Sequence, residues 1–336
     1  MTILGGRPIR ARLTASLVIG LAAFAAVCSA VVLAAAQSGF PNRPIRILTQ
    51  FPPGAVSDIS LRILADRAGP RLNTQIIVQN EPSAAGVTAA RQALSAAPDG
   101  YTLAMLSNAT AVSAATYKKM SFDPMTDFTP ISGMSDFTYV FLTNGDSKLH
   151  TLQDFLAAAK AQPGRLNFGT SAAGTTPYLA ALLFKKASGA DFTIVPYKGA
   201  PDITVALLRN DVDLVINAYG GYRDAIAEKQ LRALAVTTAK RASFLPDVPT
   251  TGEAGVPNFE VASWNGIYAP AHTPAPIIDQ LGQAFRAALA EPDLAAKFHD
   301  LGAEVWPGSA DELAARMQAE IARWNKVVDE NGIERQ

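Results

Sequence analysis

The chain of 336 residues has a single cysteine, Cys28, and only three histidines. One thiol excludes an internal disulfide, a cysteine zinc site and an iron–sulfur cluster. The histidines, His150, His272 and His299, lack the spacing of a metal site or a catalytic triad. There is also no Walker loop and no dinucleotide-binding glycine fingerprint. We therefore expect no metal and no cofactor.

Charge is scarce and balanced. Charged residues make up 17% of the chain, against about 25% in an average globular protein. Lysine plus arginine (29) equals aspartate plus glutamate (29), so no basic surface points to nucleic acid. The apolar share of 49% is too high for a disordered chain. At roughly 150 residues per domain, the length predicts two domains.

The N-terminal segment has the three parts of a secretory signal. Arg7, Arg10 and Arg12 form a basic start, Leu13 to Ala36 carries no charge, and the run ends in small residues that a signal peptidase reads. We predict that residues 1–36 are a signal peptide and that the mature chain is exported to the periplasm. The alternative is an uncleaved anchor, because at about 1.5 Å per residue the uncharged run is long enough to cross a bilayer.

Strand-like and helix-like runs alternate in the first half of the mature chain. The β-rich runs are Pro44 to Phe51, Gln75 to Asn80 and Thr102 to Asn108. Helical runs cover Ser57 to Leu72 and Ala84 to Ala97. The order βαβαβ predicts a parallel sheet covered by helices.

The same order restarts after Thr151, which forms an acidic variant of the capping box with Asp154. The strand-like runs that follow are Arg165 to Ser171, Phe192 to Gly199, Asp213 to Tyr219 and Leu231 to Thr238. Two βαβ blocks of similar length predict two lobes rather than one large sheet.

Two amphipathic helices are expected to close the chain. Thr273 would be the N-cap of the first and Pro274 its first helical residue. Ser309 and Glu312 form a capping box for the second.

The loop from Phe51 to Asp58, between the first strand and the first helix, is a candidate ligand site. In open α/β sheets, ligands bind at the carboxyl ends of the strands. Gly54 allows close approach of the backbone, and Ser57 or Asp58 can cap the helix, whose free N–H groups favour an anion. A tight turn without a ligand is the alternative interpretation. The candidate residues are Phe51, Pro53, Gly54, Ala55, Ser57 and Asp58.

A second loop of this kind, Gly169 to Leu179, follows a strand and opens a helix with Pro177 in its first turn. Ser171, Thr175 and Thr176 offer hydroxyls. Neither loop contains lysine or arginine, so backbone amides and hydroxyls would hold a bound carboxylate. Two lobes with one such loop each predict a ligand clamped between them.

A third strand end, Val195 to Gly199, carries Tyr197 and Lys198. Lys198 is either the nearest counter-charge for an anion or a solvated surface lysine. Tyr197 either packs on a ligand or fills the interface between the lobes. Trp264 is either a core residue or a wall of the ligand site.

Signals of catalysis are weak. The spacing around Ser171 is G-x-S-x-x-G, which differs from the G-x-S-x-G spacing of a nucleophile elbow. A secreted hydrolase using Ser171 is the alternative function, and it would need a base that no motif supplies. An effector-binding regulator domain would need a basic helix-turn-helix segment, but a signal sequence stands at the N-terminus.

Seven segments carry a family resemblance that covers nearly all of the chain after residue 40. They are Arg43 to Asp58, Ala97 to Leu106, Ser121 to Ser132, Phe168 to Phe184, Val195 to Leu208, Leu231 to Gly255 and Trp264 to Pro274. In this order they resemble the Bug family of periplasmic solute-binding receptors, the receptors of tripartite tricarboxylate transporters.

The resemblance implies an α/β fold of the type II periplasmic-binding-protein class, with two lobes and a ligand cleft between them. It also implies a receptor that binds small organic anions, mostly carboxylates, and delivers them to a tripartite tricarboxylate-type permease or acts as a sensor. The family's carboxylate loops fall on Phe51 to Asp58 and on Gly169 to Tyr178, which adds Tyr178 to the candidate residues. We expect a monomer, with residues 40–140 and 262–336 in lobe 1 and residues 141–261 in lobe 2.

Four positions depart from the family pattern. Ala55 replaces a second glycine in the first loop, and Ala85 replaces another glycine nearby. Glu81 stands where a basic residue is typical, and Tyr178 where a histidine is common. These departures bear on the identity of the ligand and leave the expected fold unchanged. Dicarboxylates, aromatic acids, amino acids and their amides all suit the two loops.

Overall fold

The computed structural model describes residues 39–82, 86–172, 175–257 and 259–335. A ten-stranded sheet runs through its unit Arg43–Gln336. Its strand order is β2-β1-β3-β9-β4-β7-β5-β6, and β8 and β10 also pair with β4. The strands are β1 (Ile45–Thr49), β2 (Ile76–Asn80), β3 (Thr102–Ser107), β4 (Phe128–Asn144), β5 (Asn167–Ser171), β6 (Thr193–Tyr197), β7 (Leu214–Ala218), β8 (Leu231–Val236), β9 (Ala262–Pro270) and β10 (Ala303–Val305). The predicted signal peptide, residues 1–36, lies outside the described residues.

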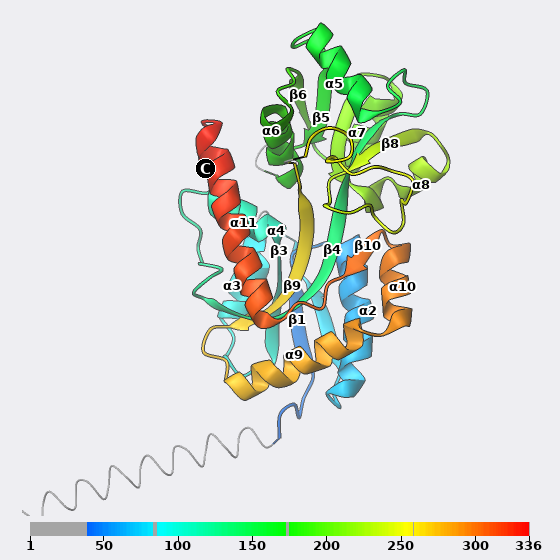
Figure 1. Cartoon of the computed structure of the whole chain (residues 1–336). Helices are drawn as coiled ribbons and strands as arrows, with labels where there is room; N and C mark the ends of the chain where they lie inside the picture. The colour runs from blue at the N-terminus through cyan, green and yellow to red at the C-terminus, as the bar shows by residue number, and fades with distance from the viewer. Residues whose placement is uncertain (1–38, 83–85, 173–174, 258, 336) are drawn as a thin grey trace, which may run out of the picture. The chain divides into compact units, whose positions relative to one another are not determined.

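Helices lie on either side of this sheet: in Figure 1, α3, α4 and α11 stand to the left of β4 and β9, and α2 and α10 to the right. The helices are α2 (Val56–Arg71), α3 (Val87–Leu94), α4 (Asn108–Thr116), α5 (Leu152–Ala161), α6 (Thr176–Ser188), α7 (Ala200–Leu208), the 3-10 turn η2 (Tyr219–Gly221), α8 (Arg223–Ala227), α9 (Ala275–Leu289), α10 (Pro292–Asp300) and α11 (Ala310–Glu330). In the described part of the chain, no helix combines the length and the apolar character that a membrane span needs.

The two βαβ blocks exist as predicted, but they share one sheet. Strand β1 pairs in parallel with β2 and β3, and β5 pairs in parallel with β6 and β7. The expectation of two lobes rather than one large sheet is therefore wrong about the sheet, because β4 and β9 join the blocks by antiparallel pairing.

Strand β4 makes this connection because it is long enough to pair with different partners along its length. Residues 128–138 pair with β9, and residues 139–144 pair with β7 and β8. The register against β9 shifts beside Pro130 and beside Gly133. Proline has no N–H for the ladder and glycine adapts to a bulge, so both residues suit these irregular positions.

Alternate residues of β4 serve two hydrophobic clusters. Tyr139 and Phe141 belong to the larger cluster, whereas Val140 and Leu142 belong to the smaller one. Successive side chains of a strand point to opposite faces, so one strand supplies both cores. The larger cluster contains a group of packed phenylalanines, in which the rings of Phe141 and Phe184 lie 4.6 Å apart.

The helix starts predicted at Thr151 and Ser309 are confirmed. Thr151 and Ser309 each cap a helix through a complete capping box, with Asp154 and Glu312 as the partners. The start predicted at Thr273 is wrong, because Pro274 is the N-cap of α9 and Ala275 its first residue. The hydroxyl of Thr273 donates to the carbonyl of Pro270 at the end of β9 (2.7 Å), and no side chain caps the start of α9.

The prediction of two closing helices missed α10, which lies between α9 and α11. This helix begins at Pro292, a residue whose missing N–H costs nothing in the first turn. The short strand β10 then pairs with β4 and returns the chain to the sheet.

Candidate functional site

Both predicted loops lie where a strand ends and a helix begins. The first connects β1 to α2, and the second connects β5 to α6, in which Pro177 occupies the first turn as predicted. The N-cap of α2 is Ala55, and it makes no side-chain cap. The expectation that Ser57 or Asp58 is the N-cap is therefore wrong, since both lie inside the first turn.

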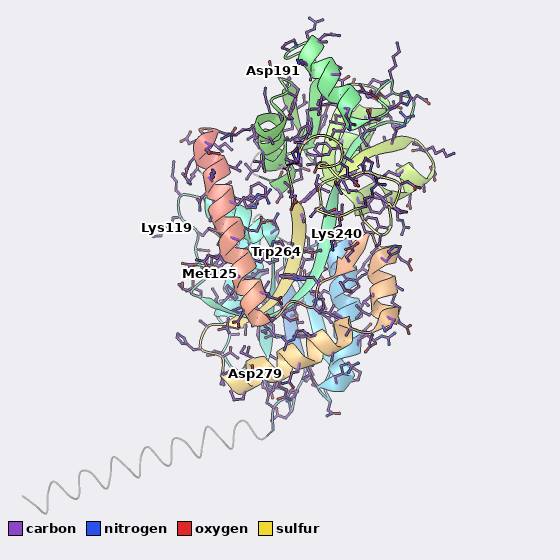
Figure 2. All side chains as sticks on the ribbon, in the orientation of Figure 1. Lys119, Met125, Asp191, Lys240, Trp264 and Asp279 are labelled. Atoms are coloured by element: carbon purple, nitrogen blue, oxygen red, sulfur yellow. The ribbon has the colours of Figure 1, made fainter. Side chains whose placement is uncertain are left out.

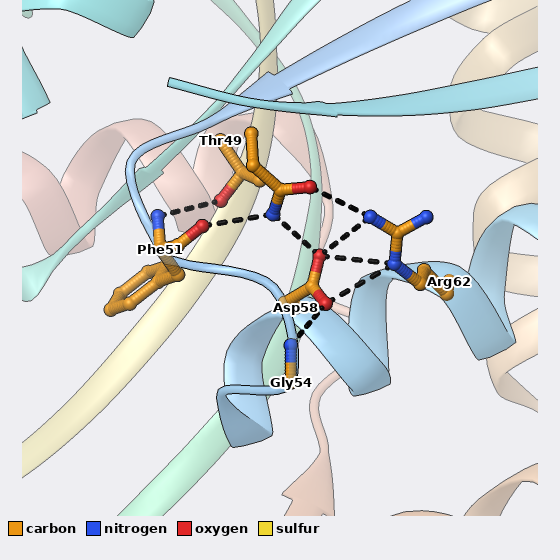
Figure 3. A network of polar contacts seen from close by, with 6 residues as sticks. Thr49, Phe51, Gly54, Asp58 and Arg62 are labelled. Atoms are coloured by element: carbon orange, nitrogen blue, oxygen red, sulfur yellow. Dashed lines mark hydrogen bonds and ion pairs between the residues drawn. The ribbon is translucent and has the colours of Figure 1, made fainter. Parts of the chain in front are cut away.

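The carboxylate of Asp58 holds the first loop in place (Figure 3). Its Oδ2 accepts a hydrogen bond from the backbone N–H of Gly54 (2.9 Å), and its Oδ1 accepts one from Nδ2 of Asn80 (2.7 Å). The same Asn80 amide donates to the carbonyl of Phe51 (2.9 Å). Arg62, one turn further along α2, donates from Nε to both carboxylate oxygens (3.1 Å each). The network ties the loop backbone to α2 and to the end of β2.

Asp58 is ionised in this network although it is only 1% exposed. Burial alone would raise the pKa of its carboxyl, but the hydrogen bonds from Arg62, Asn80 and the Gly54 N–H lower that pKa below its usual value. The carboxylate is engaged inside the protein, so we expect Asp58 to affect a ligand through the loop that it holds.

The start of α2 offers hydrogen-bond donors. Among the described residues, the backbone N–H groups of Val56 and Ser57 have no acceptor. Ser57 is buried, and its Oγ accepts a hydrogen bond from Nδ2 of Asn265 (3.0 Å), which leaves the hydroxyl proton of Ser57 free to donate. Free N–H groups at a helix start are suited to an anion.

The hydroxyls of the second loop have three different roles. Ser171 accepts a hydrogen bond from Nδ2 of Asn217 (3.3 Å) and keeps its own proton for another acceptor. Thr175 donates to the carbonyl of Ala172 (2.7 Å), so its proton is used within the loop. Thr176 is buried and accepts from Nδ2 of Asn108 (3.1 Å). Of the three, Ser171 is the best placed to donate to a ligand.

Contacts connect the two loops on one side through the start of α4. Gln50, next to the first loop, donates from Nε2 to Oγ of Ser107 (2.7 Å). The adjacent residue, Asn108, makes the hydrogen bond to Thr176 in the second loop. Nε1 of Trp324 in α11 donates to Oδ1 of Asn108 (3.1 Å) and so fixes the amide's orientation.

A second connection runs through the end of β7. Asn217 in β7 bonds Ser171 of the second loop, as described above. Gly220 in η2 packs on the first loop so closely that an added Cβ would lie 3.0 Å from Cγ2 of Val56. The structure therefore brings both predicted loops into one ring of contacts.

The remaining candidates lie around this ring or away from it. Tyr178 is half-buried in the first turn of α6, and Tyr197 is half-buried at the end of β6, packed against the smaller hydrophobic cluster. Lys198 is exposed and makes no ion pair within the part of the chain that the structure describes. Phe51 and Ala55 are half-buried, and Pro53 and Gly54 are exposed.

Trp264, labelled in Figure 2, is a core residue. It is fully buried on β9 and makes an edge contact with Trp306, with the ring centroids 6.2 Å apart. Of the two interpretations left open by the sequence, the structure supports packing.

Sequence analysis missed the side chains that support the loops, chiefly Asn80, Arg62, Asn108 and Asn217. The spacing of Asp58 and Arg62, four residues apart on one helix, was a signal that indicates an ion pair. The asparagines gave no such signal. Asn108 bonds to a residue of the second loop 68 positions away, and Asn217 bonds to one 46 positions away.

Tyr139 also supports the second loop. It lies in β4 and hydrogen-bonds with Ser263 and Thr176, and burial raises the pKa of its phenol to about 12. Within the described residues, no group of three or more side chains is arranged to hold a metal ion.

A family model described as "Tripartite tricarboxylate transporter family receptor" matches residues 60–333. The chain belongs to this family. Protein BugT of Bordetella pertussis is 32% identical over 295 residues, which are 87% of this receptor and 90% of BugT. A Cupriavidus necator protein named for the gbd 5′ region is 32% identical over 316 residues, 93% of this receptor and 95% of that protein.

Solved structures of similar proteins have the same fold as this receptor. The periplasmic binding protein BugD matches with a TM-score of 0.74 at 29% identity, over 88% of this receptor and 100% of BugD. MatC from Rhodopseudomonas palustris, solved with bound malate, matches with a TM-score of 0.72 at 30% identity, over 86% of this receptor and 100% of MatC. The R. palustris protein Rpa4515, solved with adipate, matches with a TM-score of 0.76 at 32% identity, over 88% of this receptor and 99% of Rpa4515.

These findings confirm the predicted Bug-family resemblance and the type II periplasmic-binding-protein fold. The family consists of solute-binding receptors, so this chain is a solute-binding receptor. The alternative of a hydrolase finds no support, since the recorded partner of Ser171 is the amide of Asn217 and not a base.

Proposed function

We propose that this receptor binds a small organic anion by one carboxylate, held by backbone N–H groups and hydroxyls of the two loops. The observation that carries the proposal is the ring of contacts that joins both loops. Free donors lie at Val56 and Ser57 in the first loop and at Ser171 in the second. Neither loop contains a lysine or an arginine, so the binding energy comes from oriented dipoles rather than from an ion pair.

Dicarboxylates are the first ligands to test. Two relatives of similar fold were solved with malate and with adipate, which are both dicarboxylates. Lys198 is exposed and close in sequence to the start of α7, where it would suit the second carboxylate of such a ligand. The aromatic candidate residues, Phe51, Tyr178 and Tyr197, would enclose the carbon chain.

We propose that the ligand closes two lobes on each other and that a membrane permease recognises the closed form. Lobe 1 comprises residues 40–140 and 262–336, and lobe 2 comprises residues 141–261. The change of partners along β4, between residues 138 and 139, supports a crossing at this point. One chain carries both loops, which supports a receptor that acts as a monomer.

Export is the second part of the proposal. The basic start and the uncharged run of residues 13–36 support a signal peptide that is removed after Ala36, which would place the mature receptor in the periplasm. N-terminal sequencing of the periplasmic fraction is expected to begin at Gln37. Full-length chain found only in membranes would contradict this part.

Isothermal titration calorimetry of the mature chain tests the ligand class. We expect malate or adipate to bind, whereas their uncharged diamides do not. A ligand at 100 times its dissociation constant adds about 2.7 kcal/mol of apparent stability, so thermal unfolding gives a second readout. Failure of all dicarboxylates, aromatic acids and amino acids to bind would contradict the proposal.

A further inference from the structure

The network around Asp58 places a negative charge at the loop that is proposed to bind an anion. Asp58 is the third residue of α2, next to the free N–H groups of Val56 and Ser57. The start of a helix carries a partial positive charge that attracts anions, and a fixed carboxylate opposes that attraction. A loop held by Asp58 alone would therefore repel the carboxylate of its own ligand.

Arg62 balances this charge. Its guanidinium lies against both carboxylate oxygens (3.1 Å each) and donates to Oδ1 of Asn80 (2.7 Å). The side chain of Asp58 is 2% exposed and that of Arg62 is 45% exposed, so the carboxylate is enclosed while the guanidinium reaches solvent. No other cationic side chain in the described ranges pairs with Asp58.

Arg62 lies on the same helix as Asp58, one turn further along. Residues four apart on a helix are neighbours, so α2 itself brings Arg62 next to Asp58. The pair is close to neutral when viewed from the loop, and the network still fixes the Gly54 N–H and the Phe51 carbonyl through Asp58 and Asn80.

We infer that Arg62 is a positioning residue that neutralises Asp58, so that a buried carboxylate orders the first loop without repelling an anionic ligand. The inference rests on the proposed function. It goes further because it assigns the site's ability to accept a negatively charged ligand to a residue outside both loops. Loss of Arg62 weakens binding in proportion to the charge on the ligand. A purely structural role would weaken all ligands alike.

The test compares Arg62→Met with the wild type on malate, adipate and their monoamides, by calorimetry at low and high salt. We expect binding of the dianions to weaken on the order of tenfold at low salt, with a smaller loss for the monoamides. The loss should shrink at high salt, because salt screens the repulsion. Arg62→Lys, which retains the charge, should bind nearly as well as the wild type.

Arg71→Met is the matched control. It removes an arginine from the same helix, but Arg71 pairs with Glu291 (2.6 Å) at the far end of α2. We expect Arg71→Met to bind malate, adipate and their monoamides as tightly as the wild type does. An equal loss for dianions and monoamides in Arg62→Met, or a loss that does not depend on salt, would overturn the inference and leave the proposed function intact.

A second readout needs no ligand. The pKa of Asp58, followed by the carboxyl carbon signal in NMR, should rise in Arg62→Met and stay unchanged in Arg71→Met. An unchanged pKa in Arg62→Met would overturn the inference. If the wild type binds no carboxylate at all, the proposed function fails and the inference fails with it, even where this pKa rises.

Discussion

Single hydroxyls decide how the second loop would bind an anion. Three hydroxyls were predicted to contribute, yet their hydrogen bonds differ. Thr175 uses its proton within the loop, and Thr176 is buried between Asn108 and Tyr139. Ser171 accepts from Asn217 and retains its proton.

We therefore expect Ser171→Ala to weaken binding of the tightest carboxylate by about 1–3 kcal/mol, because a donor to a charged group is lost. Calorimetry measures the effect. Ser188→Ala is the control, since this serine donates to the carbonyl of Phe184 inside α6, away from the loop. Equal affinity in the wild type and Ser171→Ala would remove the second loop from the site.

The acid sensitivity of the first loop follows from the pKa of Asp58. In the folded state this pKa lies below the value of about 3.9 expected in the unfolded chain. The ionised form is thus favoured by folding, and its stabilisation is present above about pH 4 and is lost as the pH falls through the folded-state pKa.

We expect Asp58→Asn to be less stable than the wild type at pH 7, with a difference that shrinks as the pH approaches 2. The free energy of unfolding in urea, measured from pH 7 to pH 2, checks this. A difference that stays constant over the whole range would contradict the ionic role of Asp58.

At the scale of elements, the sequence predicted local features well and long-range ones poorly. The capping boxes at Thr151 and Ser309 depend on residues three apart, and both are confirmed. The start of α9 was misplaced because the partner of Thr273 is a carbonyl in the preceding strand. The continuous sheet was missed because β4 pairs with different strands in its two halves, and periodicity along one segment does not reveal its partners.

In the candidate site, too, the sequence predicted the local features and missed the long-range contacts. The positions of both loops follow from strand–loop–helix order, which the sequence displays. The links between the loops come from Asn108 and Asn217, whose side chains meet residues far away in the sequence. Polar contacts of this kind have no period and no motif, so they are visible only in the folded chain.

The capping box of α5 permits a test of local stability. Thr151→Ala removes the oxygen that accepts from the N–H of Asp154 (3.1 Å), so we expect a loss of about 1 kcal/mol in the free energy of unfolding. Urea denaturation measures it. Lys148→Ala is the control, because Lys148 is exposed and lies outside the capping box. An unchanged stability in Thr151→Ala would show that the cap contributes nothing.

At the scale of the whole unit, the two blocks meet next to the loops. An added Cβ on Gly302 would lie 2.4 Å from Cδ1 of Tyr219, and Gly220 packs against Val56. Gly302 also has a positive φ of 71°, which disfavours other residues. Gly220 allows η2 to approach the first loop closely, and Gly302 allows Tyr219 of η2 to pack on the turn that follows α10.

We expect ligand binding to favour a closed arrangement of the two proposed lobes, because a small ligand that contacts both loops would hold them together. Small-angle scattering should show a smaller radius of gyration at saturation with the tightest carboxylate. The Gly302→Ala variant should bind more weakly, since its methyl group meets the ring of Tyr219. An unchanged scattering profile at saturation would contradict closure.

The most direct test of the account is a crystal structure of the mature receptor with its tightest carboxylate. We predict carboxylate oxygens within hydrogen-bond distance of the N–H groups at the start of α2 and of the Ser171 hydroxyl, with the Asp58–Arg62 pair intact. A carboxylate bound elsewhere, or one held by Lys or Arg side chains in place of these donors, would contradict the central claim.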